Sequence, residues 1–131
     1  MIHAKTNGEP YRIWFSNGQH EGLADATRDK GGQNAGFRPH DLLEAALACC
    51  VTMTAQMFAE KSGIPLRAVH TTVRLNRELA NETVFEVQAE FDGDLTSGQI
   101  QQLQTAIQNC PVRKTLSRSI RFDEPDPKPA D

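Results

Sequence analysis

The hydrophobic residues of this chain change their spacing near Pro65, and this change restricts the fold more than any other feature. Between Pro39 and about Lys61, apolar side chains recur every three or four residues, which predicts one long helix ending before Gly63. From residue 67 onward the interval is two, which predicts an antiparallel hairpin with one apolar and one polar face. The inward positions would be Val69, Thr71, Val73 and Leu75, and then Phe85, Val87, Ala89 and Phe91. A helix followed by such a hairpin indicates an α+β domain rather than a parallel α/β domain.

Turn and capping signals define the other elements. Asn7-Gly8 and Asn17-Gly18 favour positive φ and predict hairpins that join extended segments at 2–6, 11–16 and 19–25. Residues 96–99 read Thr-Ser-Gly-Gln, a capping box that opens a second helix with inward residues Ile100, Leu103, Ala106 and Ile107. Pro111 ends that helix, a short helical turn follows, and residues 118–122 form a last strand. The predicted order is βββ-α-ββ-α-α-β.

Length and charge narrow the class of function. A chain of 131 residues suits one domain, which we place at residues 1–122, followed by a flexible Pro/Asp-rich tail at 123–131. The net charge of −3, with neither sign gathered in blocks, argues against a nucleic acid or an anionic membrane as partner. The sequence has no signal-peptide pattern and no run of 18 apolar residues, so we expect no membrane span.

The three cysteines lie in different settings. Their odd number argues against a secreted disulfide scaffold and favours reduced thiols in the cytoplasm. Cys50 lies on the apolar stripe of the long helix, and Cys49 points about 100° away from it. Cys110 would cap the short helix after Pro111, where unpaired N–H groups and the positive helix end stabilise a thiolate. Because cysteine is also a common small core residue, this pattern leaves Cys50 and Cys110 open between packing and chemistry, and favours packing for Cys49. The stripe comprises Leu43, Leu47, Cys50, Met53 or Thr54, and Met57.

Other chemistries have less support. The four histidines and three cysteines form no CxxC or HxxxH pattern, so the sequence predicts no metal site, and nothing in it calls for a bound cofactor. A serine-hydrolase triad lacks the GxSxG elbow. Met53 and Met57 are typical of core packing, although they would line an apolar pocket if the thiols react with an organic substrate.

Two segments resemble the cysteine motifs of the OsmC/Ohr family. Residues 36–54, which read GFRPHDLLEAALACCVTMT, are similar to the helix that carries the first cysteine of that family. Residues 110–116, which read CPVRKTL, are similar to its second-cysteine motif, sixty residues after Cys50. The element order, Leu23-Ala24-Asp25 and the following Gly-rich loop extend the resemblance over about residues 3–122.

The resemblance implies a thiol peroxidase for organic hydroperoxides that works as an intertwined homodimer with sites at the subunit interface. By position, Cys50 would be the peroxidatic thiol and Cys110 the resolving thiol. Cys50 would become a sulfenic acid and condense with Cys110 to a disulfide, which an external dithiol, such as a lipoyl-type one, would reduce. Cys49 falls where the family usually has a small residue.

The activating cation of the family matches less closely. The family uses an arginine from the N-terminal loop, held by an acidic residue near the start of the long helix. Arg28 is the nearest positional match to that arginine, followed by Arg12 and Arg38. The acidic position itself is occupied by His40, and Asp41 matches a second acidic position. A neutral imidazole offers one hydrogen-bond acceptor where a carboxylate offers two oxygens, so His40 cannot anchor the arginine as a carboxylate would. The alternative function is therefore an OsmC-like binding or redox-sensing module without fast turnover.

Overall fold

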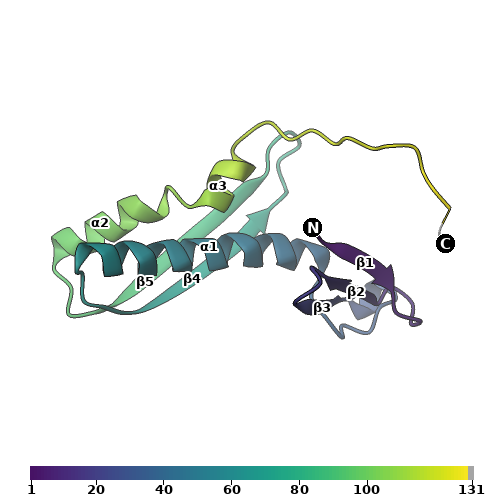
Figure 1. The fold of residues 1–131 in the computed structure, drawn as a ribbon, viewed down its shortest axis with the longest axis horizontal. Helices are drawn as coiled ribbons and strands as arrows, with labels where there is room; N and C mark the ends of the chain where they lie inside the picture. The colour runs from purple at the N-terminus through teal and green to yellow at the C-terminus, as the bar shows by residue number, and fades with distance from the viewer. Residues whose placement is uncertain (130–131) are drawn as a thin grey trace.

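The structure, a computed structural model, describes residues 1–129 and has the α+β architecture that the sequence predicts. A long helix runs the length of the domain, with a two-stranded sheet and two shorter helices beside it, and a separate three-stranded sheet lies near its N-terminal end (Figure 1). The elements in order are β1 (His3–Thr6), β2 (Ile13–Ser16), β3 (Glu21–Ala24), the 3-10 helix η1 (Arg28–Lys30), α1 (Pro39–Ser62), β4 (Leu66–Asn76), β5 (Val84–Gly93), α2 (Ser97–Ile107) and α3 (Pro111–Leu116).

Local signals in the sequence account for the ends of these elements. Gly8 and Gly18 adopt φ of 77° and 95° in the two turns that connect the strands of the antiparallel β1-β2-β3 sheet, as the Asn-Gly pairs predict. Pro39 occupies the first turn of α1, where its missing N–H costs no hydrogen bond. Gly63 then ends α1 in the left-handed conformation, with φ of 66°.

The β4–β5 hairpin has the predicted register and faces. Val73 lies opposite Val87, and Leu75 lies opposite Phe85, with these side chains half-buried and the alternate residues exposed. A hydrogen bond of 2.8 Å from the Leu75 backbone N–H to Glu44 Oε1 joins β4 to α1. The apolar face of the hairpin therefore packs against the helices and forms one side of the core.

The stripe that α1 buries differs from the predicted one. Leu47, Val51, Ala55 and Ala59 are buried at successive intervals of four, together with Leu103 and Ile107 of α2. Leu43, Met53 and Met57, predicted to face inward, are 45%, 54% and 66% exposed. The apolar residues of α1 cover much of its circumference, so the pattern alone leaves open which row meets the sheet. Ile100 of α2, also predicted inward, is 39% exposed.

The predicted strand at residues 118–122 is absent from the described chain, which is the one element of the predicted order that is wrong. This segment is irregular, and its Ile120 and Phe122 side chains are 62% and 83% exposed. An alternating pattern becomes a strand only when a neighbouring strand pairs with it, and among residues 1–129 β4 pairs only with β5. Residues 119–129 continue without regular structure, and the last two residues of the predicted tail lie outside the described residues.

Within residues 1–129, α1 is long and apolar enough to cross a membrane by length and composition, with a mean hydropathy of 1.5 over its most apolar window. Its buried row nevertheless packs against β4, β5 and α2. Length and composition alone do not distinguish a membrane-spanning helix from the core helix of a folded domain. The packing of α1 against the sheet and α2 is that of a core helix.

Candidate active site

The fold brings two cysteines that are distant in sequence into contact. Cys50 lies in the middle of α1 and is half-buried, whereas Cys110 is the N-cap residue of α3 and is fully buried. Cys110 belongs to the same core cluster as Leu47 and Val51, and Cys50 packs against that cluster. Each thiol is close enough to shift the pKa of the other. The structure therefore places together the pair that the sequence singled out.

The break between α2 and α3 positions Cys110. Pro111 cannot continue α2 and instead begins α3, so Cys110 adopts an extended backbone between the two helices. Its own N–H donates to the carbonyl of Ile107, and its carbonyl accepts from the N–H of Lys114. The side chain is held by both helices and points into the core beside α1.

The pKa values of the two thiols shift in opposite directions. Burial raises the pKa of Cys50, but hydrogen bonds from the Cys110 thiol, the Val112 backbone N–H and the Thr54 hydroxyl outweigh burial and lower that pKa below its ordinary value. Burial also raises the pKa of Cys110, and its donation to Cys50 raises it further, with partial compensation from the backbone N–H groups of Arg113 and Val112. Cys50 is therefore the more acidic thiol of the pair, although Cys110 has the helix-end position.

Thr54 is a site residue that sequence reasoning missed. The sequence pattern treats it only as a member of the apolar stripe, whereas its Oγ1 lies over the preceding turn and donates a hydrogen bond of 2.7 Å to the carbonyl oxygen of Cys50. The spacing of four residues from Cys50 was the available signal, because residues at that spacing lie on the same helix face. A hydroxyl has one hydrogen, so this donor serves the carbonyl or the sulfur at any one time.

Among residues 1–129, neither Asp41 nor any of the predicted arginines has a side chain that contributes to the pKa shift of either thiol. Asp41 binds Arg38, with an Nη2–Oδ1 distance of 2.6 Å, and accepts from the Arg38 backbone N–H at 3.0 Å. These bonds lower the pKa of Asp41 and form the cap of α1. Arg28 is exposed in η1, and among residues 1–129 no lysine or arginine side chain contributes to the pKa shift of Cys50. The role of Arg28 stays a prediction.

Asp25 organises the loop that carries Arg28. This buried carboxylate, 2% exposed, accepts hydrogen bonds from the backbone N–H groups of Ala26, Gln33 and Ala35, at 2.8, 3.1 and 3.0 Å. Those bonds lower the pKa of Asp25 despite its burial, and the bond from the Ala35 N–H has the largest effect. An acidic side chain directly before a Gly-rich loop was the signal for this role.

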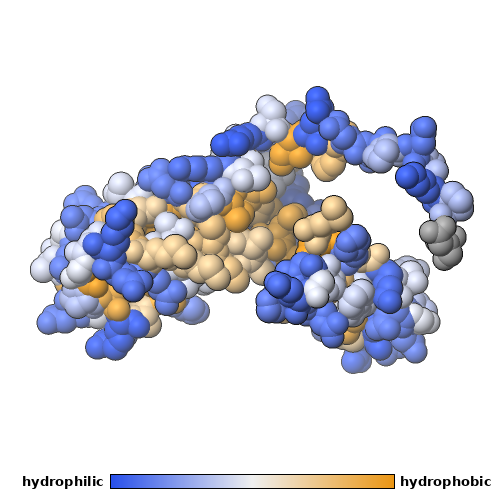
Figure 2. All heavy atoms as spheres, viewed as in Figure 1, coloured by the Kyte–Doolittle hydropathy of each residue, from blue (hydrophilic) through white to orange (hydrophobic). Residues whose placement is uncertain are grey.

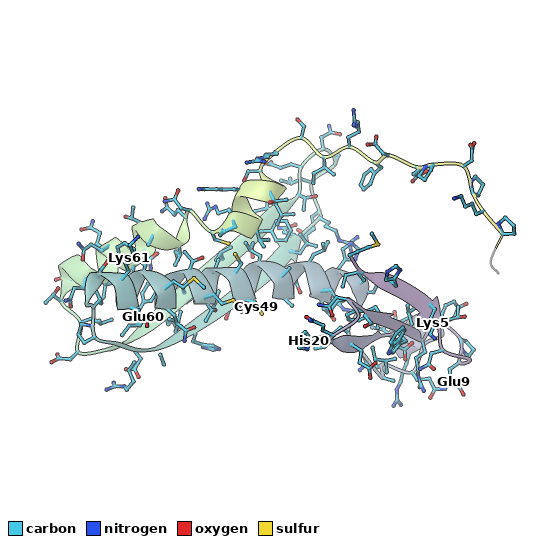
Figure 3. The ribbon with its side chains drawn as sticks, viewed as in Figure 1. Lys5, Glu9, His20, Cys49, Glu60 and Lys61 are labelled. Carbon is cyan, nitrogen blue, oxygen red and sulfur yellow. The ribbon has the colours of Figure 1, made fainter. Side chains whose placement is uncertain are left out.

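Cys49 and the two exposed methionines lie on a side of α1 away from the core. Cys49 is exposed midway along the helix (Figure 3), and Met53 and Met57 follow at intervals of four. A space-filling view shows apolar surface along α1 between the main body and the N-terminal sheet (Figure 2). In the part of the chain that the structure describes, no group of three or more histidine, cysteine or acidic side chains is arranged to hold a metal ion.

Comparison with known proteins agrees with this architecture. A family model described as OsmC-like protein matches residues 31–124, and no curated protein matches the sequence. Three similar solved structures are an OsmC-like protein of Mycoplasma pneumoniae, an organic hydroperoxide resistance protein of Elizabethkingia anophelis and the organic hydroperoxide resistance protein OhrB of Bacillus subtilis. Each is 20% identical, with TM-scores of 0.69, 0.68 and 0.62. The aligned regions cover 88%, 89% and 89% of this chain and 85%, 88% and 89% of those chains. At this identity the likeness shows a shared fold.

Proposed function

This chain belongs to the OsmC-like protein family, and from that membership we propose that it reduces organic hydroperoxides with Cys50 as the reactive thiol and Cys110 as its partner. The observation that carries the proposal is the contact between the two thiols, with the pKa of Cys50 lowered and that of Cys110 raised. A thiolate is the nucleophilic form of cysteine, and a neighbouring thiol can resolve its oxidised product.

The reaction begins when the Cys50 thiolate attacks the distal oxygen of the hydroperoxide. The O–O bond breaks, the alkoxide leaves and takes up a proton to become an alcohol, and Cys50 is oxidised to a sulfenic acid. The Cys110 sulfur then attacks the Cys50 sulfur, and the hydroxyl leaves with a proton as water. An external dithiol, such as a lipoyl-type one, attacks the resulting disulfide through a mixed disulfide and returns both thiols.

The active assembly in this proposal is a homodimer in a reducing cytoplasm. Support comes from the exposed apolar side of α1 and from the N-terminal sheet, which lies outside the main body of its own chain (Figure 1). An apolar surface of this kind is typical of an interface. Such a dimer would bring Arg28 of one copy toward Cys50 of the other, where no lysine or arginine side chain among residues 1–129 of the same chain contributes to the pKa shift.

A second candidate function is a binding or redox-sensing module of the same fold. The state of the two positions from which an acidic group would hold Arg28 favours this function. Asp41 is already bound to Arg38, and the other position is occupied by His40. Without an anchored arginine, the thiols would oxidise slowly and the protein would respond to oxidants instead of consuming them.

Consumption of cumene hydroperoxide with dihydrolipoamide or dithiothreitol distinguishes the two functions. We expect turnover by the wild type, no turnover by Cys50→Ser, and a sulfenic acid on Cys110→Ser that dimedone traps. Cys49→Ser is the matched control because it removes an exposed thiol one position away, and we expect it to retain turnover. Equal, negligible rates in all four proteins would contradict the peroxidase and support the module.

A further inference from the structure

The connection between β1 and β2 ends in a turn that has a tyrosine where the backbone favours glycine. The turn comprises residues 9–12, beginning at Glu9 (Figure 3), and the N–H of Arg12 donates to the carbonyl of Glu9 over 3.3 Å. Pro10 is its second residue and Tyr11, with φ of 63°, is its third. This is the pattern of a type II turn, whose third position ordinarily carries Gly or Asn. A bulky side chain in the left-handed region is strained, and it persists only where other contacts maintain it.

The ring of Tyr11 lies against the loop that carries Arg28. It is so close to Gly31 that a Cβ added to Gly31 would be 3.0 Å from Cε2 of the ring. Gly31 ends η1 with φ of 92°, and its N–H donates to the Arg28 carbonyl over 3.1 Å. Tyr11 is itself 61% exposed, so burial in a core does not account for its conformation. The ring is therefore connected to the backbone of Arg28 through a single residue, Gly31.

The same turn interacts with this loop at a second point, through Asp25. The backbone N–H of Ala35 has the largest effect in lowering the pKa of this buried carboxylate, and the positive charge of Arg12, which follows Tyr11, lowers it further. Asp25 accepts from backbone N–H groups at both ends of the loop, at Ala26 and at Ala35. The turn at residues 9–12 thus supports the loop both at its middle, through the tyrosine ring, and at its ends, through the carboxylate.

We propose that Tyr11 is a positioning residue, whose ring over Gly31 holds η1 and thereby the guanidinium of Arg28 in one arrangement. The inference rests on the proposed function, in which Arg28 of one copy lies toward Cys50 of the other. Because the attraction between a cation and a thiolate weakens with distance, a loop that moves freely would leave Cys50 less reactive. The strain at Tyr11 is then maintained for catalysis rather than for stability.

Two substitutions that remove the ring and relieve the strain test the loop independently of catalysis. Tyr11→Asn and Tyr11→Gly introduce residues that tolerate positive φ, so we expect an apparent Tm equal to that of the wild type or higher. Amide hydrogen exchange at Lys30, Gly31 and Gly32, whose N–H groups bond within the loop, should nevertheless accelerate. Tyr11→Phe keeps the ring and is the matched control, with exchange rates equal to those of the wild type. Unchanged exchange in the Asn and Gly variants, or a Tm that falls in both, would overturn the proposal.

Hydroperoxide turnover tests whether the ring acts through Arg28. With cumene hydroperoxide, kcat/KM should fall by about tenfold in Tyr11→Asn and stay at the wild-type value in Tyr11→Phe. In an Arg28→Gln background, Tyr11→Asn should cause no further fall, because the group that the ring positions is already absent. Equal losses from Tyr11→Asn with and without Arg28, or equal losses in the Asn and Phe variants, would overturn the assignment. Absence of turnover in the wild type would contradict the proposed function instead, and hydrogen exchange would still decide whether Tyr11 holds the loop.

Discussion

Thr54 lies one helical turn after Cys50, and its hydroxyl donates a hydrogen bond of 2.7 Å to the Cys50 carbonyl oxygen. The same hydroxyl is also one of the groups that lower the pKa of the Cys50 thiol, so its single hydrogen can serve one acceptor or the other. When Cys50 ionises, the sulfur becomes the stronger acceptor, because hydrogen bonds to charged groups are stronger than those between neutral groups. Rotation of one hydroxyl would then redirect this donor without moving the helix.

Replacement of Thr54 by valine should raise the pKa of Cys50, because it removes a donor to the thiolate but keeps the branched shape. The rate of alkylation of Cys50 by iodoacetamide at pH 7 should fall by about threefold to tenfold. This is measured in a background in which Cys49 is serine. Thr105→Val is the matched control, since Thr105 makes the same bond to Gln101, at 3.0 Å, in α2. An unchanged rate in Thr54→Val would show that the hydroxyl serves only the backbone.

The alkylation rate of Cys50 should depend on pH as expected for a thiol of lowered pKa. The thiolate is present above the folded pKa and is lost as pH falls through it, so half-maximal reactivity should occur below the ordinary thiol value of 9.0. Cys110→Ala removes a hydrogen-bond donor to Cys50 and should move this midpoint to higher pH. Cys110→Ser retains an O–H donor and should move it less. Coincident profiles for the two variants would exclude Cys110 as a donor.

The loop held by Asp25 should loosen in Asp25→Asn, because the amide oxygen is uncharged and cannot replace both carboxylate oxygens. Amide hydrogen exchange at Ala26, Gln33 and Ala35 should accelerate, and the apparent Tm should fall. Since folding lowers the pKa of Asp25, its contribution to stability is present above the ordinary value of 3.8 and is lost as pH falls through the folded value. The difference in Tm between wild type and variant should therefore disappear in acid. Asp94→Asn, at an exposed position, is the control.

Leu47 should contribute more to stability than an exposed leucine. It is 2% exposed, so Leu47→Ala leaves a cavity and should lower the free energy of unfolding by about 2–5 kcal/mol in urea titrations at one protein concentration. Leu79 is 53% exposed, and Leu79→Ala should change that free energy by less than about 0.5 kcal/mol. Similar losses in the two variants would contradict the packing described for α1.

The exposed methionines of α1 should be needed for dimer formation. Met57 is 66% exposed, and Met57→Asp would place a charge in an apolar interface, so light scattering after size-exclusion chromatography should show a monomer. Gln104→Asp adds the same charge at an exposed position of α2 and should leave the dimer intact. A stable dimer of Met57→Asp would place the interface elsewhere.

Local signals determined much of this structure. The Asn-Gly turns, the proline at the start of α1, Gly63 at its end and the capping box of α2 act within a few residues of themselves, so the order of the described elements follows from them. The positions of Cys50 and Cys110 left both open between packing and chemistry, and the resemblance of the two cysteine motifs to the OsmC/Ohr family assigned them as a pair.

Relationships between distant segments required the tertiary structure. The apolar residues of α1 fit more than one burial pattern, and packing against β4 and α2 selected the row through Leu47, Val51 and Ala55. The pattern at 118–122 would need a neighbouring strand, and the part of the chain that the structure describes pairs none with it. The sequence by itself determined which helices carry the two thiols. Only the tertiary structure decided which thiol is the stronger acid, because that depends on burial and on donors that the fold brings from Thr54, Val112 and Cys110 to one sulfur.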